Sequence, residues 1–221
     1  MRQTYHDELD QIVSSLVGMT NDVRIAVHDA TRALLNADAV LAEKVVNDDP
    51  RLDKQHDDLE ERCFTLLARQ APVAGELRTI VAALRMAFEL ARMGDLAVHI
   101  AKITGMRAPA LAVPETLRAN FSRMAEVADE MILVAGQTLD QRDVSEATKL
   151  AESDEEIDEL RRQQFRVLLA DDWEFGVEAA VDVALLGRYF ERIADHAVSM
   201  GSRIIYVITG MSPAGENWPN A

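Results

Sequence analysis

Cysteine, aromatic residues and basic residues are all scarce in this sequence, and each shortage argues against particular folds, sites or partners. Cys63 is the only cysteine among 221 residues, which excludes an intrachain disulfide and fits a reducing compartment. Its neighbours Leu59, Leu66 and Leu67 predict a buried, unreactive thiol. The Cys and His spacing of a zinc finger does not occur in the chain.

Aromatic residues make up 5% of the chain, which contains only 6 prolines and 10 glycines. Proteins made of β-sheets are richer in aromatic and β-branched residues and need frequent turns. The whole chain is 48% hydrophobic, and Ala, Leu, Val, Met, Glu, Asp and Arg dominate it. This composition favours long packed helices. We therefore expect an all-α protein with a sizeable core.

Positive charge is also in short supply, since 23 Lys and Arg residues stand against 38 Asp and Glu, for a net charge of -15. Nucleic acids are bound through basic patches, so this balance argues against a nucleic-acid partner. It also disfavours adhesion to anionic lipid. No hydrophobic run approaches the length of a membrane span, and residues 1–11 lack the apolar core of a signal peptide. We expect a soluble, cytoplasmic protein with no direct membrane insertion.

Apolar residues recur every three to four positions over most of the chain, which predicts amphipathic helices. The six expected helices cover residues 5–35, 38–69, 76–104, 115–139, 144–169 and 176–209. Helices of roughly thirty residues are about 45 Å long. Three such helices joined by short turns pack as an up-down-up bundle.

Proline and glycine mark the expected boundaries between these helices. The segment Gln-Ala-Pro-Val-Ala-Gly at 70–75 separates the second helix from the third, and residues 106–114 contain two further prolines. The prediction is a first three-helix bundle at 1–105, a linker at 106–114, a second bundle at 115–210 and a C-terminal tail at 211–221. Trp218 in that tail either tethers it to the body or is unanchored.

The two halves of the chain repeat one another. Asp95 and Asp195 are 100 residues apart, as are the arginines three positions before them, whereas Asp53 and Asp158 are 105 apart. A repeat of this length predicts two similar lobes and an elongated, pseudo-symmetric molecule. The change of offset places a loss of about five residues in the loop before the last helix.

The repeat carries pairs of acidic residues four positions apart, which lie on one face of a helix. In the first lobe these positions are Asp49, Asp53 and Asp95, and in the second they are Asp154, Asp158, Glu191 and Asp195. Clustered carboxylates repel one another unless a cation is present, and oxygen ligands select hard ions such as Mg²⁺, Mn²⁺ or iron. A metal site is one interpretation.

Two other interpretations stay open for these acidic residues. In a chain with 38 acidic residues such pairs arise by chance and are simply hydrated, or they are neutralised by nearby arginines such as Arg92 and Arg192. His99 and His196 neighbour the acidic positions, but a lone histidine is more often a structural hydrogen-bonding group than a ligand.

A metal-dependent helical enzyme of the di-metal carboxylate type is the catalytic alternative. Such sites need a Glu-x-x-His motif on each of two helices. The motif is missing here, and the nearest sequence is Asp53-Lys54-Gln55-His56. A phosphate-binding glycine loop and a nucleophile elbow are also missing. We therefore expect a protein that is not an enzyme.

Three segments together resemble the PhoU family. They are Pro-Val-Ala-Gly-Glu-Leu-Arg at 72–78, Leu-Ala-Arg-Met-Gly-Asp-Leu-Ala at 90–97 and Phe-Glu-Arg-Ile-Ala-Asp-His-Ala at 190–197. The likeness runs from the first helix to about Gly210 and includes the duplication. It implies two three-helix bundles in tandem.

The resemblance also implies a function. Members of this family restrain the phosphate-starvation response and limit phosphate uptake by linking the Pst phosphate ABC transporter, through its ATPase subunit, to the sensor histidine kinase PhoR. It implies an adaptor without turnover, and the long amphipathic helices lead us to expect a homodimer. Several members bind iron or zinc clusters through a repeated Glu/Asp-x-x-x-Asp motif.

Carried over to this chain, the acidic motif falls on Asp49 with Asp53, Asp154 with Asp158, and Glu191 with Asp195. The fourth copy departs from it, because Ala91 replaces the first acid and only Asp95 is kept. The second lobe is therefore the better candidate for a metal.

Overall fold

The computed structural model describes residues 2–70, 72–147 and 149–211, and within these ranges every regular element is a helix. The helices are α1 (Arg2–Asn36), α2 (Ala39–Gln70), α3 (Ala74–Arg107), α4 (Glu115–Gln141), α5 (Val144–Ala147), α6 (Leu150–Leu168) and α7 (Gly176–Thr209). The prediction of an all-α protein is confirmed. Residues 212–221, including Trp218, lie outside the described residues.

Most helix ends differ by one to three residues from those expected, and two differences coincide with contacts to α7. The helix expected over 144–169 is divided into α5 and α6, at the point where Ala147 and Leu150 pack against Gly201 of α7. A Cβ atom at Gly201 would lie 2.5 Å from a methyl group of Leu150. Helix α3 also continues two residues into the expected linker, because Arg107 in its last turn pairs with Glu178 and Asp182 of α7.

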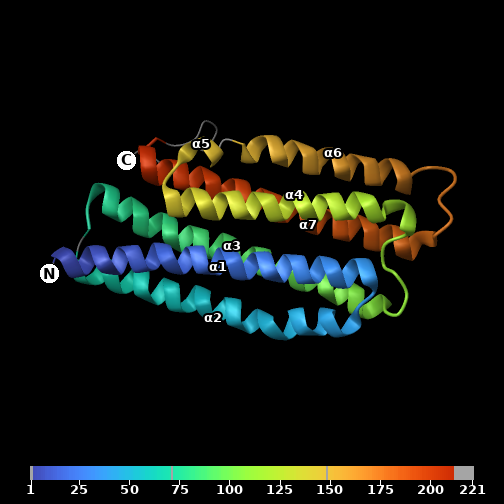
Figure 1. The fold of residues 1–221 in the computed structure, drawn as a ribbon, viewed down its shortest axis with the longest axis horizontal. Helices are drawn as coiled ribbons and strands as arrows, with labels where there is room; N and C mark the ends of the chain where they lie inside the picture. The colour runs from blue at the N-terminus through green and yellow to red at the C-terminus, as the bar shows by residue number, and fades with distance from the viewer. Residues whose placement is uncertain (1, 71, 148, 212–221) are drawn as a thin grey trace.

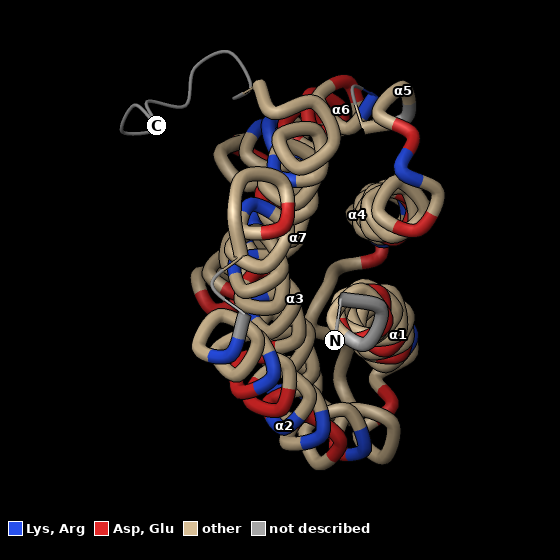
Figure 2. The backbone as a smooth tube through the Cα atoms, turned by 90° about the vertical axis from the view of Figure 1, so that its left-hand side faces the viewer, with Lys and Arg blue, Asp and Glu red and all other residues tan. Residues whose placement is uncertain are grey.

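The helices form two three-helix lobes that lie side by side. Lobe one consists of α1, α2 and α3, and lobe two of α4, α6 and α7 with the short α5. The lobes meet along two pairs of helices, α1 with α4 and α3 with α7. Viewed nearly along the helices, α2, α3, α7 and α6 form a row that α1 and α4 cover on one side (Figure 2).

Buried apolar residues in α1 and α4 match at an offset of 105 residues. Leu16 corresponds to Phe121 and Val27 to Ile132, and all four are at most 1% exposed. The same offset separates Arg24 from Asp129, whose side chains form a two-pronged ion pair at 2.9 and 2.7 Å. A contact between equivalent residues lies on the axis that relates the lobes, so this pair marks the pseudo-two-fold axis.

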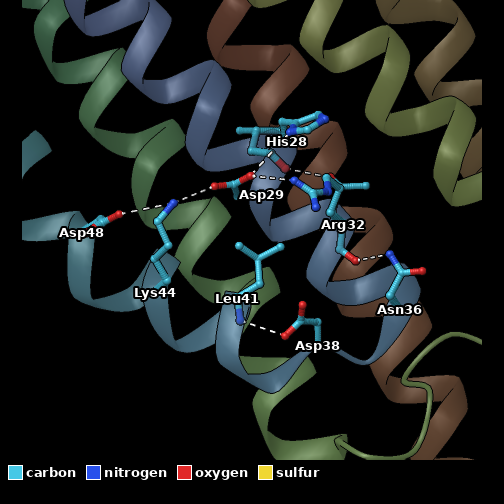
Figure 3. A network of polar contacts seen from close by, with 10 residues as sticks. His28, Asp29, Arg32, Asn36, Asp38, Leu41, Lys44 and Asp48 are labelled. Carbon is cyan, nitrogen blue, oxygen red and sulfur yellow. Dashed lines mark hydrogen bonds and ion pairs between the residues drawn. The ribbon is translucent and has the colours of Figure 1, made fainter.

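The turn between α1 and α2 shows how local sequence sets the helix ends. Asp38 accepts a hydrogen bond from the backbone N–H of Leu41 at 3.0 Å, as an N-cap residue does, and therefore starts α2 (Figure 3). Asp29 of α1 pairs with Lys44 of α2 at 3.1 Å, which fixes the angle between the two helices just beyond the turn.

Candidate functional site

In lobe one, the predicted acidic residues lie where α2 crosses α3. A Cβ atom at Gly94 would lie 2.9 Å from Leu52 and 3.5 Å from an oxygen of Asp49, so glycine lets the helices approach closely here. Burial raises the pKa of Asp49, and the charges of Asp53 and Asp95 raise it further. The three predicted residues of this lobe are thus close enough to influence one another.

In lobe two, the equivalent residues lie between α6 and α7. The pKa of Asp154 is raised to about 6, first by burial and then by Asp195, Asp158 and Glu191. The pKa of Asp195 is also raised, by burial and then by Glu191. For both carboxyl groups, burial and the neighbouring negative charges therefore outweigh the positive charge nearby. The structure therefore brings all four predicted acids of lobe two into one electrostatic group.

Arginine side chains supply part of that positive charge. Glu191 accepts hydrogen bonds from Arg161 of α6 and pairs with Arg188 one turn earlier on α7, at 2.7 Å. Arg188 also lies 3.9 Å from Asp195. In lobe one, Arg92 pairs with Asp95 at 2.5 Å.

The sequence leaves open that nearby arginines neutralise the acidic residues. The structure supports this interpretation, with a partly different set of arginines. Arg92 was expected, whereas in lobe two the described ion pairs involve Arg161 and Arg188 and not Arg192. Sequence reasoning missed both. For Arg188 the available signal was its spacing, three residues before Glu191 on the same helix, whereas Arg161 lies on a different helix from Glu191.

The donor chemistry of lobe two fits a hard cation, because it consists of carboxylates and two of them, Asp154 and Asp195, have raised pKa values. The arrangement does not yet form a ligand set: within the described ranges, no three Asp, Glu, His or Cys side chains gather closely enough to hold a metal. Asp154, Asp158, Glu191 and Asp195 would hold such an ion after rotation of their side chains and release of Glu191 from its arginines. The metal site stays a prediction.

The two candidate histidines are engaged elsewhere. His196 is bonded through Nδ1 to Glu89 of α3 at 2.6 Å, and Ser199 and Arg203 donate to the same carboxylate at 2.8 and 3.2 Å. Burial opposes the ionised form of Glu89, but these hydrogen bonds outweigh it and hold its pKa below the usual value. The network joins α3 to α7 and therefore one lobe to the other.

His99 stacks on Tyr189 of α7, with ring centroids 5.3 Å apart. This contact is the symmetry-related copy of Glu89 with Ser199, because each residue lies 100 positions from its equivalent.

Cys63 is fully buried and its pKa is raised to about 11, mainly by burial, which confirms the expected unreactive thiol. Among the described helices, none is long and apolar enough to cross a membrane.

These features define a class of protein: an all-α duplication in which matching carboxylates lie where an outer helix of each lobe crosses an inner one. The PhoU domain family matches residues 16–104 and 121–204. The chain belongs to the PhoU family.

Several members of this family are similar over almost the whole chain. The phosphate-specific transport system accessory protein PhoU homolog 1 of Mycobacterium leprae is 42% identical over 221 residues, covering 100% of both chains. PhoU homolog 2 of Mycobacterium tuberculosis is 44% identical, covering 96% of this chain and 100% of its own. The crystal structure of PhoU from Pseudomonas aeruginosa matches with a TM-score of 0.85 at 25% identity, over 94% of this chain and 100% of its own.

Proposed function

We propose that this protein is a regulator of phosphate uptake and of the phosphate-starvation response that acts as an accessory of a phosphate transporter. The observation that carries the proposal is the match over full length to mycobacterial proteins described as accessories of the phosphate-specific transport system. The protein acts by binding and without turnover, in keeping with the accessory role in those names.

The finer proposal is an adaptor in the cytoplasm between the ATPase subunit of the Pst transporter and the sensor kinase PhoR. Asp154 and Asp195 have raised pKa values, so they are stabilised by any positive charge that approaches. A basic surface on a partner supplies such charge, and charge complementarity steers docking over a long range. Figure 2 shows Asp and Glu distributed along α2 and α6, the outer helices of the row.

The test is a phosphate-regulon reporter, such as secreted phosphatase activity, in cells that lack this gene and grow in phosphate-rich medium. High activity that a plasmid copy silences supports the regulator. Unchanged activity in a strain that has no second PhoU-type gene contradicts it. Asp195→Ala tests the site, with Glu174→Ala as a matched control because Glu174 is exposed and is not among the charges that raise the pKa of Asp154 or Asp195. Silencing by both variants contradicts a role for the acidic residues of lobe two.

We also propose that lobe two holds a metal ion, with iron, zinc, magnesium and manganese as candidates. Metal content of the purified protein is measured by mass spectrometry for the wild type and for Asp154→Ala. A loss of metal in the variant supports the site, and equal content in both proteins contradicts it.

The proposed homodimer is tested by light scattering, where a monomer mass across micromolar concentrations contradicts it.

A further inference from the structure

The side chains of α3 that reach solvent form one narrow stripe along the second half of the helix. They recur at alternating intervals of three and four residues, while nearly all the residues between them are buried. The stripe consists of Arg85, Phe88, Arg92, Asp95, His99, Lys102 and Met106. Because α3 packs against α1, α2 and α7, the stripe lies on the remaining side of the helix, on the face of the row away from α1 and α4 (Figure 2).

The charge of this stripe is opposite to that of the protein. The chain has a net charge of -15, yet the stripe contains three Lys or Arg residues and a histidine against one acid, Asp95. Arg92 binds that acid at 2.5 Å, and the side chain of Arg92 is still 40% exposed. Helix α7 adds the half-buried Arg192, which lies 100 residues after Arg92. We call the seven residues on α3 the basic stripe.

Large apolar side chains are exposed along the same line. Phe88 is 54% exposed and Met106 is 68% exposed, and Leu185 of α7 is 42% exposed. Near Met106, an open hollow of about 580 Å³ lies between α2, α3 and α7, and Lys102, Met106 and Leu185 are among its walls. Exposed apolar residues that gather in this way mark interaction sites.

Two acidic residues also line the hollow. Asp182 is buried and is bound by Arg107 at 2.5 Å, so its charge is already compensated. Glu43 belongs to α2. The α3 side of the hollow, with Lys102 and the adjoining basic stripe, therefore keeps an excess of positive charge.

We propose that the basic stripe and the hollow at its end bind an amphipathic helix of a partner protein, which carries carboxylates at seven-residue spacing and a large apolar residue. A seven-residue repeat is the spacing with which one helix lies along another. The distance from Arg85 to Met106 is about 32 Å, or about six helical turns. Carboxylates complement the basic residues, and the apolar side chain enters the hollow, as in other complexes of a helix with a groove.

Two other occupants fit this surface less well. An anionic membrane is flat and wider than the stripe, so it would also meet the acidic residues of α2 and α6, which lie on either side of α3 and α7 in the row (Figure 2). A second copy of this chain that places stripe against stripe would bring like charges together. A narrow acidic helix avoids both conflicts.

This surface adds a second docking face to the proposed function, with a charge opposite to that of the acidic residues of lobe two. A protein with two such faces can hold a basic partner and an acidic partner at once. The inference does not depend on the regulator proposal. A failed reporter test leaves the binding measurements below unaffected, and failed binding leaves the regulator proposal standing.

Fluorescence anisotropy of a labelled synthetic peptide with the full-length protein tests the proposal. The peptide has about 21 residues, which match the length of the stripe when helical, and it carries glutamate at every seventh position with one phenylalanine beside them. The expected binding weakens with added salt. It is several-fold tighter than binding of a peptide of the same composition whose glutamates are spread around the helix. Equal binding of the two peptides, or no binding of either, overturns the proposal.

Variants with matched controls locate the binding surface. Phe88→Glu should weaken binding about tenfold or more, as the loss of an aromatic anchor does, whereas Phe64→Glu on α2, where the side chain is equally exposed at 55%, should not. Lys102→Glu should also weaken binding, with Arg166→Glu on α6 as the exposed control. Because all four side chains are exposed, the fold is retained, and circular dichroism checks this. Unchanged binding by both Phe88→Glu and Lys102→Glu overturns the proposal.

A photo-reactive amino acid in place of Phe88 identifies the natural occupant in living cells, with the same replacement at Phe64 as the control. An adduct with an acidic helical segment of another protein, formed at Phe88 and not at Phe64, supports the proposal. Adducts with lipid or with a second copy of this chain overturn it, and so does the lack of any adduct specific to Phe88.

Discussion

The two lobes differ most at one acidic position and at the residues around it. In lobe two, Glu191 is held by Arg161 and Arg188. The equivalent positions in lobe one, 100 residues earlier on α3 and 105 earlier on α2, are Ala91, Phe88 and His56. The acid and both arginines are therefore present together in one lobe and missing together in the other.

This difference indicates what the arginines do. They accompany Glu191 but do not offset the burial and the neighbouring carboxylates that raise the pKa of Asp154 to about 6. In lobe one, where the additional acid is missing, burial, Asp53 and Asp95 raise the pKa of Asp49 and Lys102 lowers it. Any cation that the protein binds, whether a metal ion or a basic partner surface, is thus expected at lobe two.

The junction between the lobes offers a second comparison. Glu89 accepts hydrogen bonds from α7 in a buried site, whereas its equivalent Tyr189 makes a ring stack with His99. The same position between α3 and α7 thus occurs twice in the pseudo-symmetric molecule. One copy holds a charged network and the other holds two stacked rings.

The largest effect is expected from replacing these two equivalent residues by leucine. Glu89→Leu leaves His196, Ser199 and Arg203 without their shared acceptor, and losing one side of a buried charged pair costs about 3–5 kcal/mol. Tyr189→Leu keeps apolar volume and loses the stack, at about 1 kcal/mol. Urea denaturation measures both, with Glu89→Gln as an intermediate control. Equal losses for the two leucine variants would show that the polar network adds nothing beyond packing.

An intermediate effect on stability is expected when residues of lobe two are replaced by their equivalents from lobe one. Glu191→Ala leaves two arginines facing each other without their carboxylate, which should cost about 1–3 kcal/mol of unfolding free energy. The triple variant Glu191→Ala, Arg161→His, Arg188→Phe copies lobe one and should recover most of that loss. Denaturation curves of both proteins check this. A triple variant less stable than the single one contradicts the interpretation that the three residues form a unit.

Much of the fold could be predicted from the sequence because its signals are local and repeated. Apolar periodicity places every long helix except α6 to within a few residues, and the type of Asp38 identifies it as an N-cap residue. The matching acidic motifs could be paired by their offsets alone, and the structure brings them into common electrostatic groups.

What could not be predicted depends on contacts between helices. Gln164 is 1% exposed and bonds to Asn120 at 2.7 Å, although its equivalent in lobe one is the apolar Leu59. It fits because Gly187 leaves room for it where lobe one has alanine. Spacing along one helix does not show which side chain of the next helix will face it, so Arg161 was missed for the same reason.

The smallest effect, and the one that separates a metal from a basic partner surface, is expected at Asp154. Burial and the neighbouring carboxylates raise its pKa from the usual 3.8 to about 6 in the folded protein, so the folded state binds more protons and stability falls as pH rises through that window. Asp154→Asn removes the repulsion and should stabilise the metal-free protein at pH 7.5 by about 0.5–1 kcal/mol, after allowance for solvent screening. The gain should vanish near pH 4.

Thermal unfolding at these two pH values measures the effect, with Glu174→Gln as the exposed control. Added Mn²⁺ or Fe²⁺ then reverses the sign if lobe two holds a metal, because the wild type gains stability from the ion and the variant does not. If the ions leave both proteins unchanged while the gain at pH 7.5 persists, the result contradicts a Mn²⁺ or Fe²⁺ site and favours the proposed basic partner surface. A variant with wild-type stability at both pH values would show that Asp154 is already neutralised in the folded protein.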